Sequence, residues 1–332
     1  MSNYSAVITG TGRALGERRI TNDTVARECG ISMAELETAN KDGYTVRWRA
    51  GENVFTSTLM AEAAKNALLR ASVKPEDVDL LICATNTPDF TAPPTSARVQ
   101  HEAGLRNAGF FDLNSTCAGF AMALAAASAM LRRDGGMRHA LVAGGNIYSR
   151  FLAPDDVAGR LLFSDSAGAV LLSASPEKGR GICASVMRGD GRHWRRWGIF
   201  AGGGWKGFSP ETLARGYQYV KTVEPYEKGI NVRNWPLAAR DVIEKAGWRP
   251  EEVELGFFNQ SRRRNIEAVC AGFGWPLSVS HDTIHKYGYC GSGCVPVAMD
   301  DARENGLLKP GRKTIILTSG TGYAISAAAL IL

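Results

Sequence analysis

The stretch Asp112-Leu-Asn-Ser-Thr-Cys117-Ala-Gly-Phe120 connects a strand-like segment, residues 109–113, to a run of small apolar residues, 118–131. Such a run is typical of a helix that is buried on most sides, which places Cys117 at or next to the first turn of that helix. Free backbone N–H groups and the positive end of the helix dipole meet there, and they lower the pKa of a thiol. The pattern therefore predicts either a nucleophilic cysteine that holds an acyl group as a thioester, or a small buried cysteine that only packs.

Strand-like and helix-like segments alternate on both sides of this stretch, which favours an α/β fold with buried sheets. In the first half the expected strands are 6–10, 80–85, 140–143 and 167–172, and an expected helix spans 56–72. The second half repeats this rhythm, with helices at 235–246 and 295–305 and strands at 254–258, 314–318 and 324–332. We therefore expect two similar halves, 1–175 and 176–332. Residues 188–219 show no clear period and are interpreted as a substrate loop or as irregular decoration.

Composition places the chain among globular proteins, since its 332 residues are 45% hydrophobic and 22% charged. No apolar run is long enough to cross a bilayer, and residues 1–6 lack the features of a signal peptide, so we expect a cytoplasmic protein with no membrane contact. The seven cysteines include no C-x-x-C pair, and no histidines are spaced to complete a zinc site. We therefore expect no disulfides and no metal, with Cys290 and Cys294 as small core residues.

The net charge of +6 is concentrated in two clusters of arginines, 192–196 and 262–264. Such clusters either attract phosphate-bearing ligands and acidic proteins or form a solvated face. No nucleic-acid-binding motif accompanies them, so nucleic acid is not an expected partner.

Several stretches, taken together and in order, resemble the β-ketoacyl-acyl-carrier-protein synthase III family. They are Ile8-Thr-Gly-Thr-Gly12, Asp77-Val-Asp-Leu-Leu-Ile-Cys-Ala-Thr85, Thr116-Cys-Ala-Gly-Phe120, Leu162-Phe-Ser-Asp-Ser-Ala-Gly-Ala-Val170 and Ser319-Gly-Thr-Gly-Tyr323. The resemblance covers almost the whole chain. It implies a thiolase-like five-layered αβαβα fold with two similar halves, usually as a homodimer. It also implies an acyl-CoA or acyl-carrier phosphopantetheine as substrate, with no permanently bound cofactor.

The resemblance also implies roles for individual residues. Cys117 matches the cysteine that is acylated, and Thr321 matches the residue of the second half whose N–H completes the oxyanion hole with the N–H of Cys117. Arg264 matches a basic residue near the CoA phosphates, and Arg262 adds charge beside it. Trp194 is a candidate for stacking on the adenine or for lining the acyl tunnel.

The sequence departs from the family at two positions, where a histidine and an asparagine assist decarboxylation of a malonyl extender. The matching residues are Asn259 and Tyr289. An asparagine amide donates a hydrogen bond but cannot accept a proton at neutral pH. Among the five histidines, we consider His285 the better candidate for a replacement base and His193 the second.

These substitutions leave several functions open. The main hypothesis is acyl transfer from Cys117 to a non-malonyl small-molecule acceptor, an alcohol, an amine or an activated carbon, in specialised metabolism. The alternatives are C–C condensation assisted by Asn259 and Tyr289, a non-catalytic partner subunit of an active homologue, and a binding module for acyl carrier protein.

Overall fold

Two β-sheets with a pair of helices between them form the body of the protein. The computed structural model describes residues 4–133, 136–177 and 179–332. The first sheet has the strand order β1 (Ser5–Leu15), β7 (Ser166–Ser175), β6 (His139–Asn146), β4 (Leu80–Ala84) and β5 (Gly109–Leu113). The second sheet has the order β11 (Leu255–Phe258), β12 (Lys313–Gly320), β13 (Ala324–Ile331) and β8 (Gly181–Gly189). Both sheets are mixed. In the first, β4 runs parallel to β5 and β6 while β7 runs antiparallel to its neighbours. In the second, β11 runs parallel to β12 while β13 runs antiparallel to its neighbours.

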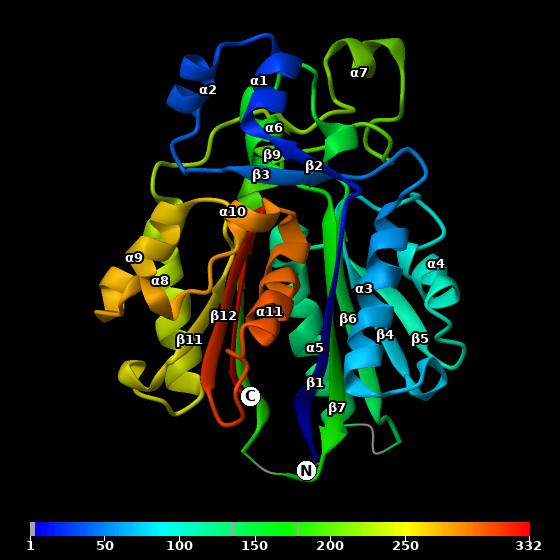
Figure 1. Ribbon diagram of the computed structural model, residues 1–332, viewed down its shortest axis with the longest axis vertical. Helices are drawn as coiled ribbons and strands as arrows, with labels where there is room; N and C mark the ends of the chain where they lie inside the picture. The colour runs from blue at the N-terminus through cyan, green and yellow to red at the C-terminus, as the bar shows by residue number, and fades with distance from the viewer. Residues whose placement is uncertain (1–3, 134–135, 178) are drawn as a thin grey trace.

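Helices cover both sheets and fill the space between them, which gives five layers (Figure 1). On the outer face of the first sheet lie α3 (Thr56–Ala71) and α4 (Thr95–Glu102), and on the outer face of the second lie α8 (Ile230–Lys245) and α9 (Arg263–Phe273). The middle layer is formed by α5 (Gly119–Arg133) and α11 (Cys294–Glu304). Six of the nine buried residues of α5 are glycine, alanine or serine, and their small size lets the helix pack against both sheets. The predicted thiolase-like fold is confirmed.

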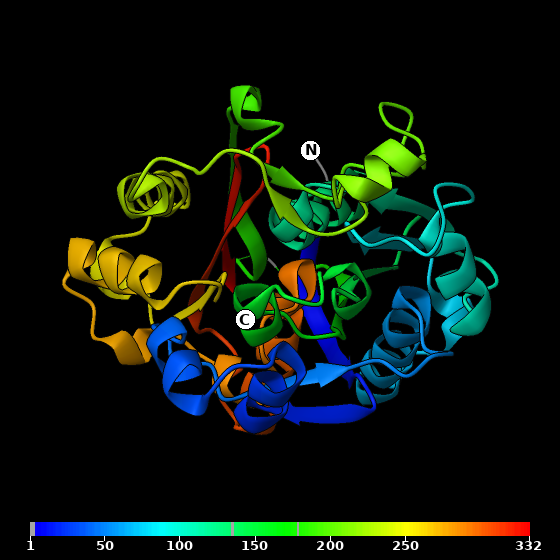
Figure 2. The same cartoon turned by 90° about the horizontal axis from the view of Figure 1, so that it is seen from above.

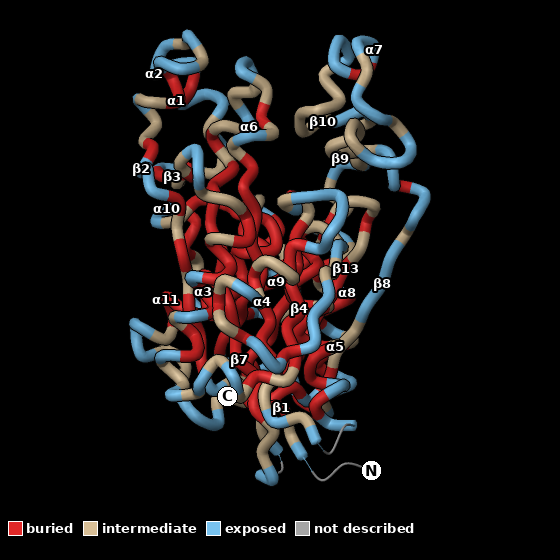
Figure 3. The backbone as a smooth tube through the Cα atoms, turned by 90° about the vertical axis from the view of Figure 1, so that its right-hand side faces the viewer, coloured by how far each residue is buried: buried red, intermediate tan, exposed pale blue. Residues whose placement is uncertain are grey.

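The remaining elements gather over one end of the sheets, at the top of Figure 1, and Figure 2 shows them from above. They are β2 (Arg18–Thr21), α1 (Asn22–Cys29), α2 (Met33–Ala39), β3 (Val46–Arg49), α6 (Val157–Leu162), β9 (Trp197–Gly198), α7 (Pro210–Ala214), β10 (Lys221–Thr222) and α10 (Ile284–Tyr287). Short 3₁₀ turns are η1 (Pro75–Asp77), η2 (Thr116–Ala118), η3 (Ser149–Phe151), η4 (Gly191–His193), η5 (Pro250–Glu252), η6 (Leu277–Val279) and η7 (Gly291–Gly293). Figure 3 shows that burial is concentrated in the sheets and central helices, whereas this end is more exposed.

The predicted segments agree with the observed elements, with two clear differences. The helix expected at 235–246 begins five residues earlier, because α8 spans Ile230–Lys245 and continues through Pro236. The other difference is in β1. We expected this strand to end at Gly10, but it continues to Leu15. The glycines do not end the strand. They let it pass close to α3, because a Cβ at Gly10 would lie 2.3 Å from the carbonyl oxygen of Ala67. The segment 188–219 contains η4, β9 and α7 and is otherwise irregular.

The two central helices start in the same way. Each follows a 3₁₀ turn, η2 before α5 and η7 before α11, and the two turns pack against each other. Ser115 before η2 has φ −130° and ψ 35°, and Cys290 before η7 has φ −117° and ψ 34°. The next residues, Thr116 and Gly291, have φ 47° and 59°. This repeated geometry agrees with the prediction of two similar halves, whose sheets divide the chain between Ser175 and Gly181.

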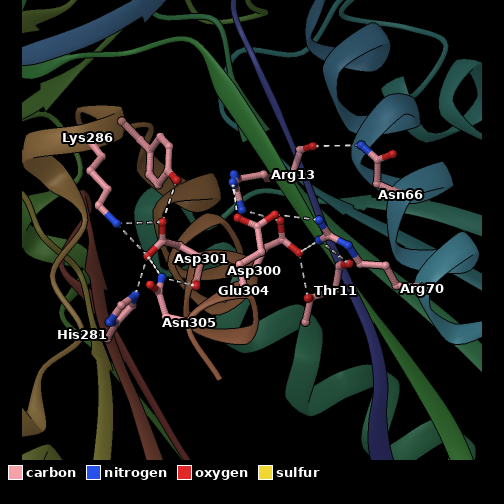
Figure 4. Close-up of polar contacts among 11 residues, drawn as sticks. Thr11, Arg13, Asn66, Arg70, His281, Lys286, Asp300, Asp301, Glu304 and Asn305 are labelled. Carbon is pink, nitrogen blue, oxygen red and sulfur yellow. Dashed lines mark hydrogen bonds and ion pairs between the residues drawn. The ribbon is translucent and has the colours of Figure 1, made fainter. Parts of the chain in front are cut away.

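A buried carboxylate ties the halves together (Figure 4). Asp300 on α11 is fully buried and accepts hydrogen bonds from Thr11 at 2.8 Å, from Arg13 at 2.7 Å and from Arg70. The same two arginines reach Glu304, at 2.6 Å and 2.8 Å. Because Arg13 and Arg70 belong to β1 and α3, this network fixes α11 to the first half.

Candidate active site

A pocket of about 360 Å³ opens in front of Cys117. Residues of both halves line it. The first half contributes Cys117 and Phe163, and the second half contributes residues that include Tyr226, Tyr289 and Thr321. Cys117 itself is 8% exposed. The predicted cysteine therefore faces a cavity large enough for part of a substrate, which favours the nucleophile over a cysteine that only packs.

The backbone around Cys117 is tightly constrained. Cys117 lies in η2, between the end of β5 and the start of α5. The preceding residue, Thr116, has φ 47°, a left-handed conformation that is rare for a β-branched residue. Gly320 lets the end of β12 approach this turn, since a Cβ there would lie 2.2 Å from Thr116 Oγ1. Such strained backbone is typical of functional sites.

Thr321 lies at the pocket, as the resemblance implied, but its N–H is already engaged. It donates to Thr116 Oγ1 at 2.6 Å. The N–H of Thr321 is therefore not free to bind an oxyanion in this structure. Rotation of the Thr116 side chain away from this N–H is required before it can act as the second donor.

The thiol of Cys117 is surrounded by hydrogen-bonding groups. Its sulfur is within reach of the hydroxyls of Tyr289 and Tyr148 and of the side chain of Asn259. Burial nevertheless raises the pKa of Cys117, while these hydrogen bonds lower it in part. The expectation that the helix start lowers this pKa is wrong for the resting protein, because desolvation of the thiolate outweighs it.

Asn259 and Tyr289 are held rigidly beside the sulfur. Asn259 follows β11, and its Nδ2 donates to the Ser319 carbonyl at 2.9 Å while its Oδ1 accepts from the Ser261 N–H at 3.3 Å. The Tyr289 N–H donates to the Leu162 carbonyl at 3.1 Å. Burial raises the pKa of the Tyr289 phenol well above its ordinary value. Both side chains therefore act as hydrogen-bond donors, and neither is a base at neutral pH.

Tyr148 is a site residue that the sequence did not indicate. It follows the end of β6, is fully buried, and its hydroxyl donates to Asn86 Oδ1 at 2.9 Å. The carboxyl ends of β4, β5 and β6 meet at one edge of the sheet because these strands are parallel. A search for polar residues after each predicted strand would have found it.

Comparisons with known proteins agree with this fold and site. Residues 111–191 match the family model described as 3-oxoacyl-[acyl-carrier-protein (ACP)] synthase III, and residues 243–332 match its C-terminal counterpart. A β-ketoacyl-[acyl-carrier-protein] synthase III of Rhizorhabdus wittichii is 33% identical over 98% of both chains. The chain belongs to the β-ketoacyl-acyl-carrier-protein synthase III family.

Solved structures extend the comparison. The 3-oxoacyl-(acyl carrier protein) synthase III of Pseudomonas aeruginosa has a TM-score of 0.88 and 28% identity, with 98% of each chain covered. The priming β-ketosynthase of the R1128 polyketide pathway has a TM-score of 0.85 and 26% identity, covering 98% of this chain and 96% of that one. The chain is thus a ketosynthase III-type transferase. The names of these relatives favour the condensing alternative over a non-malonyl acceptor.

His285 is not positioned to act as a base at Cys117. It is exposed on α10 and does not line the Cys117 pocket. It lines two smaller cavities with Arg263 and Asp282. The short helix directs the side chain toward the surface, so the prediction of His285 as the catalytic base is wrong for this structure.

The basic residues lie at the pocket, but Trp194 does not. Arg262 and Arg264 both line it. Arg262 pairs with Asp42 at 2.8 Å, whereas exposed Arg264 makes no ion pair with any residue that the structure describes. Trp194 is 54% exposed and lies edge-on to Trp205 at 5.3 Å. Trp197 lines the pocket instead and approaches Phe163 at 6.1 Å.

Other kinds of site find no support in the part of the chain that the structure describes. No group of His, Cys, Asp and Glu side chains there is arranged to hold a metal ion. No helix there is long and apolar enough to span a membrane.

Proposed function

We propose that this protein takes an acyl group from acyl-CoA or acyl-carrier phosphopantetheine onto Cys117 and passes it to a non-malonyl acceptor. The observation that carries this proposal is that Cys117 faces a pocket and that none of the described residues lining it is a histidine. The reaction would run in the cytoplasm without a permanently bound cofactor. Arg264, which has no ion-pair partner among the described residues, would bind the phosphates of the donor together with Arg262.

The geometry suggests how loading proceeds. The donor thioester enters past the arginines, and its carbonyl carbon meets the sulfur of Cys117. The N–H of Cys117 would stabilise the oxyanion, joined by the N–H of Thr321 once Thr116 releases it. Each such donor typically contributes a few kcal/mol in an acyl transfer. The leaving thiol of the donor takes up the proton that Cys117 loses.

C–C condensation with a malonyl extender is the second candidate, and the names of the relatives favour it. In this case the amide of Asn259 and the phenol of Tyr289 would polarise the malonyl thioester carbonyl while CO₂ leaves. Both groups are donors of the right kind, but a neutral amide and a neutral phenol stabilise developing negative charge less than an imidazolium does.

Malonyl-acyl carrier protein separates the two candidates. We expect the acetyl-loaded protein to release CO₂ from it at less than about a hundredth of the rate of a synthase III with the family histidine, which is the usual loss when one positioned catalytic group is absent. The measurement is ¹⁴CO₂ release from labelled malonyl carrier protein. The Asn259→His/Tyr289→Asn double variant is the matched control and should gain activity. Rapid CO₂ release by the unmodified protein would establish the condensing function instead.

The pocket also bears on the two non-catalytic hypotheses. A partner subunit or a carrier-binding module needs no open cavity in front of a cysteine that two phenols and an amide surround. We therefore favour turnover over these hypotheses, and the variant at Cys117 described in the Discussion tests them.

We further propose a homodimer that forms along β5. This strand lies at the edge of the first sheet, where unpaired backbone groups are available to a second chain. Its Phe110 and Phe111 are 42% and 37% exposed, and a second copy would cover both.

We expect wild-type protein to elute as a dimer in light-scattering chromatography and Phe110→Asp to be monomeric. Leu69→Asp, at a residue that is 77% exposed on α3, should remain dimeric. A dimeric Phe110→Asp variant would exclude this edge as the interface.

A further inference from the structure

The pocket in front of Cys117 has two chemically different parts. One part is polar and comes from the start of α9 and the residues before it, namely Ser261, Arg262, Arg264 and Asn265. The other part is rich in rings, which are those of Phe163, Trp197, Tyr226, Tyr289 and Tyr323. The aliphatic side chains among the described lining residues are Leu162 and Ile230. Aromatic side chains therefore dominate the apolar surface that a substrate meets.

Three of these rings form a continuous group that starts at the sulfur. The Tyr289 hydroxyl is within reach of the sulfur of Cys117. The ring of Phe163 lies 5.9 Å from that of Tyr289 and 6.1 Å from that of Trp197, tilted by 40° and 41°. Aromatic rings attract one another through their edges and faces at such separations. We call Phe163, Trp197 and Tyr289 the aromatic wall.

Backbone pairing holds the aromatic wall in place before any substrate binds. The Ser164 N–H donates to the Tyr289 carbonyl at 2.8 Å, and the Tyr289 N–H donates to the Leu162 carbonyl at 3.1 Å. Trp197 pairs with Thr222 in the short sheet of β9 and β10. Binding to side chains that are already positioned costs less conformational entropy, so their contacts contribute more fully to affinity.

A further ring closes the pocket behind Phe163. Tyr148 is fully buried, and its ring centre lies 4.1 Å from that of Phe163. A long acyl chain that extended from Cys117 in this direction would meet these two rings. The acyl group that fits beside the sulfur is therefore compact and lies along the aromatic wall.

We propose that the acyl group received by Cys117 carries a flat aromatic ring, so that the donor is an arylacyl thioester. This inference rests on the proposed function and names its donor class. The sulfur of Cys117 forms a bond to the carbonyl carbon, the bond from that carbon to the donor sulfur breaks, and the thiol proton of Cys117 passes to the donor sulfur. The aryl ring packs against Phe163 and Trp197, while the phosphates of the donor stay at Arg262 and Arg264.

A flat ring gains more from this wall than a saturated group of similar size does. Two aromatic rings attract beyond the effect of buried area, because the positive edge of one meets the negative face of the other. A saturated ring has neither such an edge nor such a face, so it gains only from the removal of apolar surface from water. The contrast between the two kinds of ring is therefore a direct test.

Two donors that differ only in the ring provide this test. Phenylacetyl-CoA and cyclohexylacetyl-CoA both place a methylene group between ring and thioester, so their carbonyl groups have similar reactivity. They are mixed in equal amounts with the protein, and the two adducts on Cys117 are measured by peptide mass at early times. We expect the phenylacetyl adduct to form about tenfold faster, a ratio equivalent to about 1.4 kcal/mol. Burial alone would favour the saturated ring, which is the more apolar of the two.

Variants of the aromatic wall show which rings make the contact. We expect Trp197→Leu, which keeps an apolar side chain, to reduce the preference for phenylacetyl by about threefold or more. Phe163→Leu should reduce it in the same way. Trp205→Leu is the matched control, because Trp205 belongs to the same irregular segment but is 61% exposed and is not among the lining residues. It should keep the wild-type ratio. Because the ratio compares two donors on one protein, a partial loss of folded protein does not change it.

The outcomes separate this inference from the proposed function. A wild-type protein that forms both adducts equally, or the cyclohexylacetyl adduct faster, overturns the inference while loading of Cys117 still stands. A wild-type ratio in both Trp197→Leu and Phe163→Leu also overturns it, because the aromatic wall would then not contact the acyl group. A wild-type protein that gains no mass on Cys117 from these donors or from acetyl-CoA overturns the proposed function itself.

Discussion

Replacing Cys117 with alanine is expected to abolish acyl loading and to reduce acyl transfer by about 10⁴-fold or more, the scale of loss when a covalent nucleophile is removed. In the proposed function the thioester forms at this sulfur, and the nearby hydroxyls of Tyr148 and Tyr289 cannot replace it, because they are neutral phenols whose pKa values burial raises well above their ordinary values. The measurement is intact mass after incubation with acetyl-CoA, followed by peptide mapping of the acetylated residue.

A second cysteine variant controls for reaction elsewhere. Cys183 is an exposed cysteine on β8, so Cys183→Ala should load and turn over like the wild type. A mass gain in Cys117→Ala would place the nucleophile at another residue. If wild-type protein does not turn over and both proteins bind acyl carrier protein equally, the chain is a binding module. If wild-type protein loads only when an active homologue is added, it is a partner subunit.

The sequence predicted the placement of Cys117 because that placement depends on local pattern. A strand, three polar residues and a run of alanines locate Cys117 at the start of α5 without knowledge of the rest of the chain. The meeting of Asn259 and Tyr289 at the sulfur was available only from the resemblance. Both lie more than a hundred residues away in the sequence, and their contact depends on how the second half packs onto the first.

What the sequence could not show depends on packing and solvation. The pKa of Cys117 was expected to fall because the helix dipole is a local property, but the burial that raises it is set by the whole pocket. The placement of His285 at the pocket failed for the same reason. His285 follows an apolar residue near a glycine, and this pattern allows its side chain to point either into the pocket or to the surface. In the structure α10 directs it to the surface. His193 lies in a segment with no period, yet the fold buries it beside Tyr226.

The network at Asp300 is a further feature that the sequence could not show, because it joins residues that are 287 and 230 positions apart. We expect Asp300→Asn to lower the free energy of unfolding by about 3 kcal/mol, since removing the buried partner leaves Arg13 and Arg70 with only the half-exposed Glu304 as a counter-charge. The amide that replaces the carboxylate also presents N–H groups to Arg13 or Arg70, which are donors themselves. The measurement is urea unfolding followed by tryptophan fluorescence, with the m-value as a check that the transition stays cooperative.

Glu304→Gln is the matched control for this prediction. Glu304 contacts the same two arginines, but its side chain is 44% exposed. Because water can solvate the arginines after the charge is removed, we expect the free energy of unfolding to fall by less than about 1 kcal/mol. Because both carboxylates contact the same two arginines, a larger loss of stability in Asp300→Asn than in Glu304→Gln would show that burial of the ion pair, and not the number of ion pairs, determines the cost. Because α11 begins at η7, which packs on the turn that holds Cys117, Asp300→Asn should also slow acyl loading below the temperature at which it unfolds. Equal destabilisation by the two variants would mean that Asp300 does not act as a buried tie between the halves.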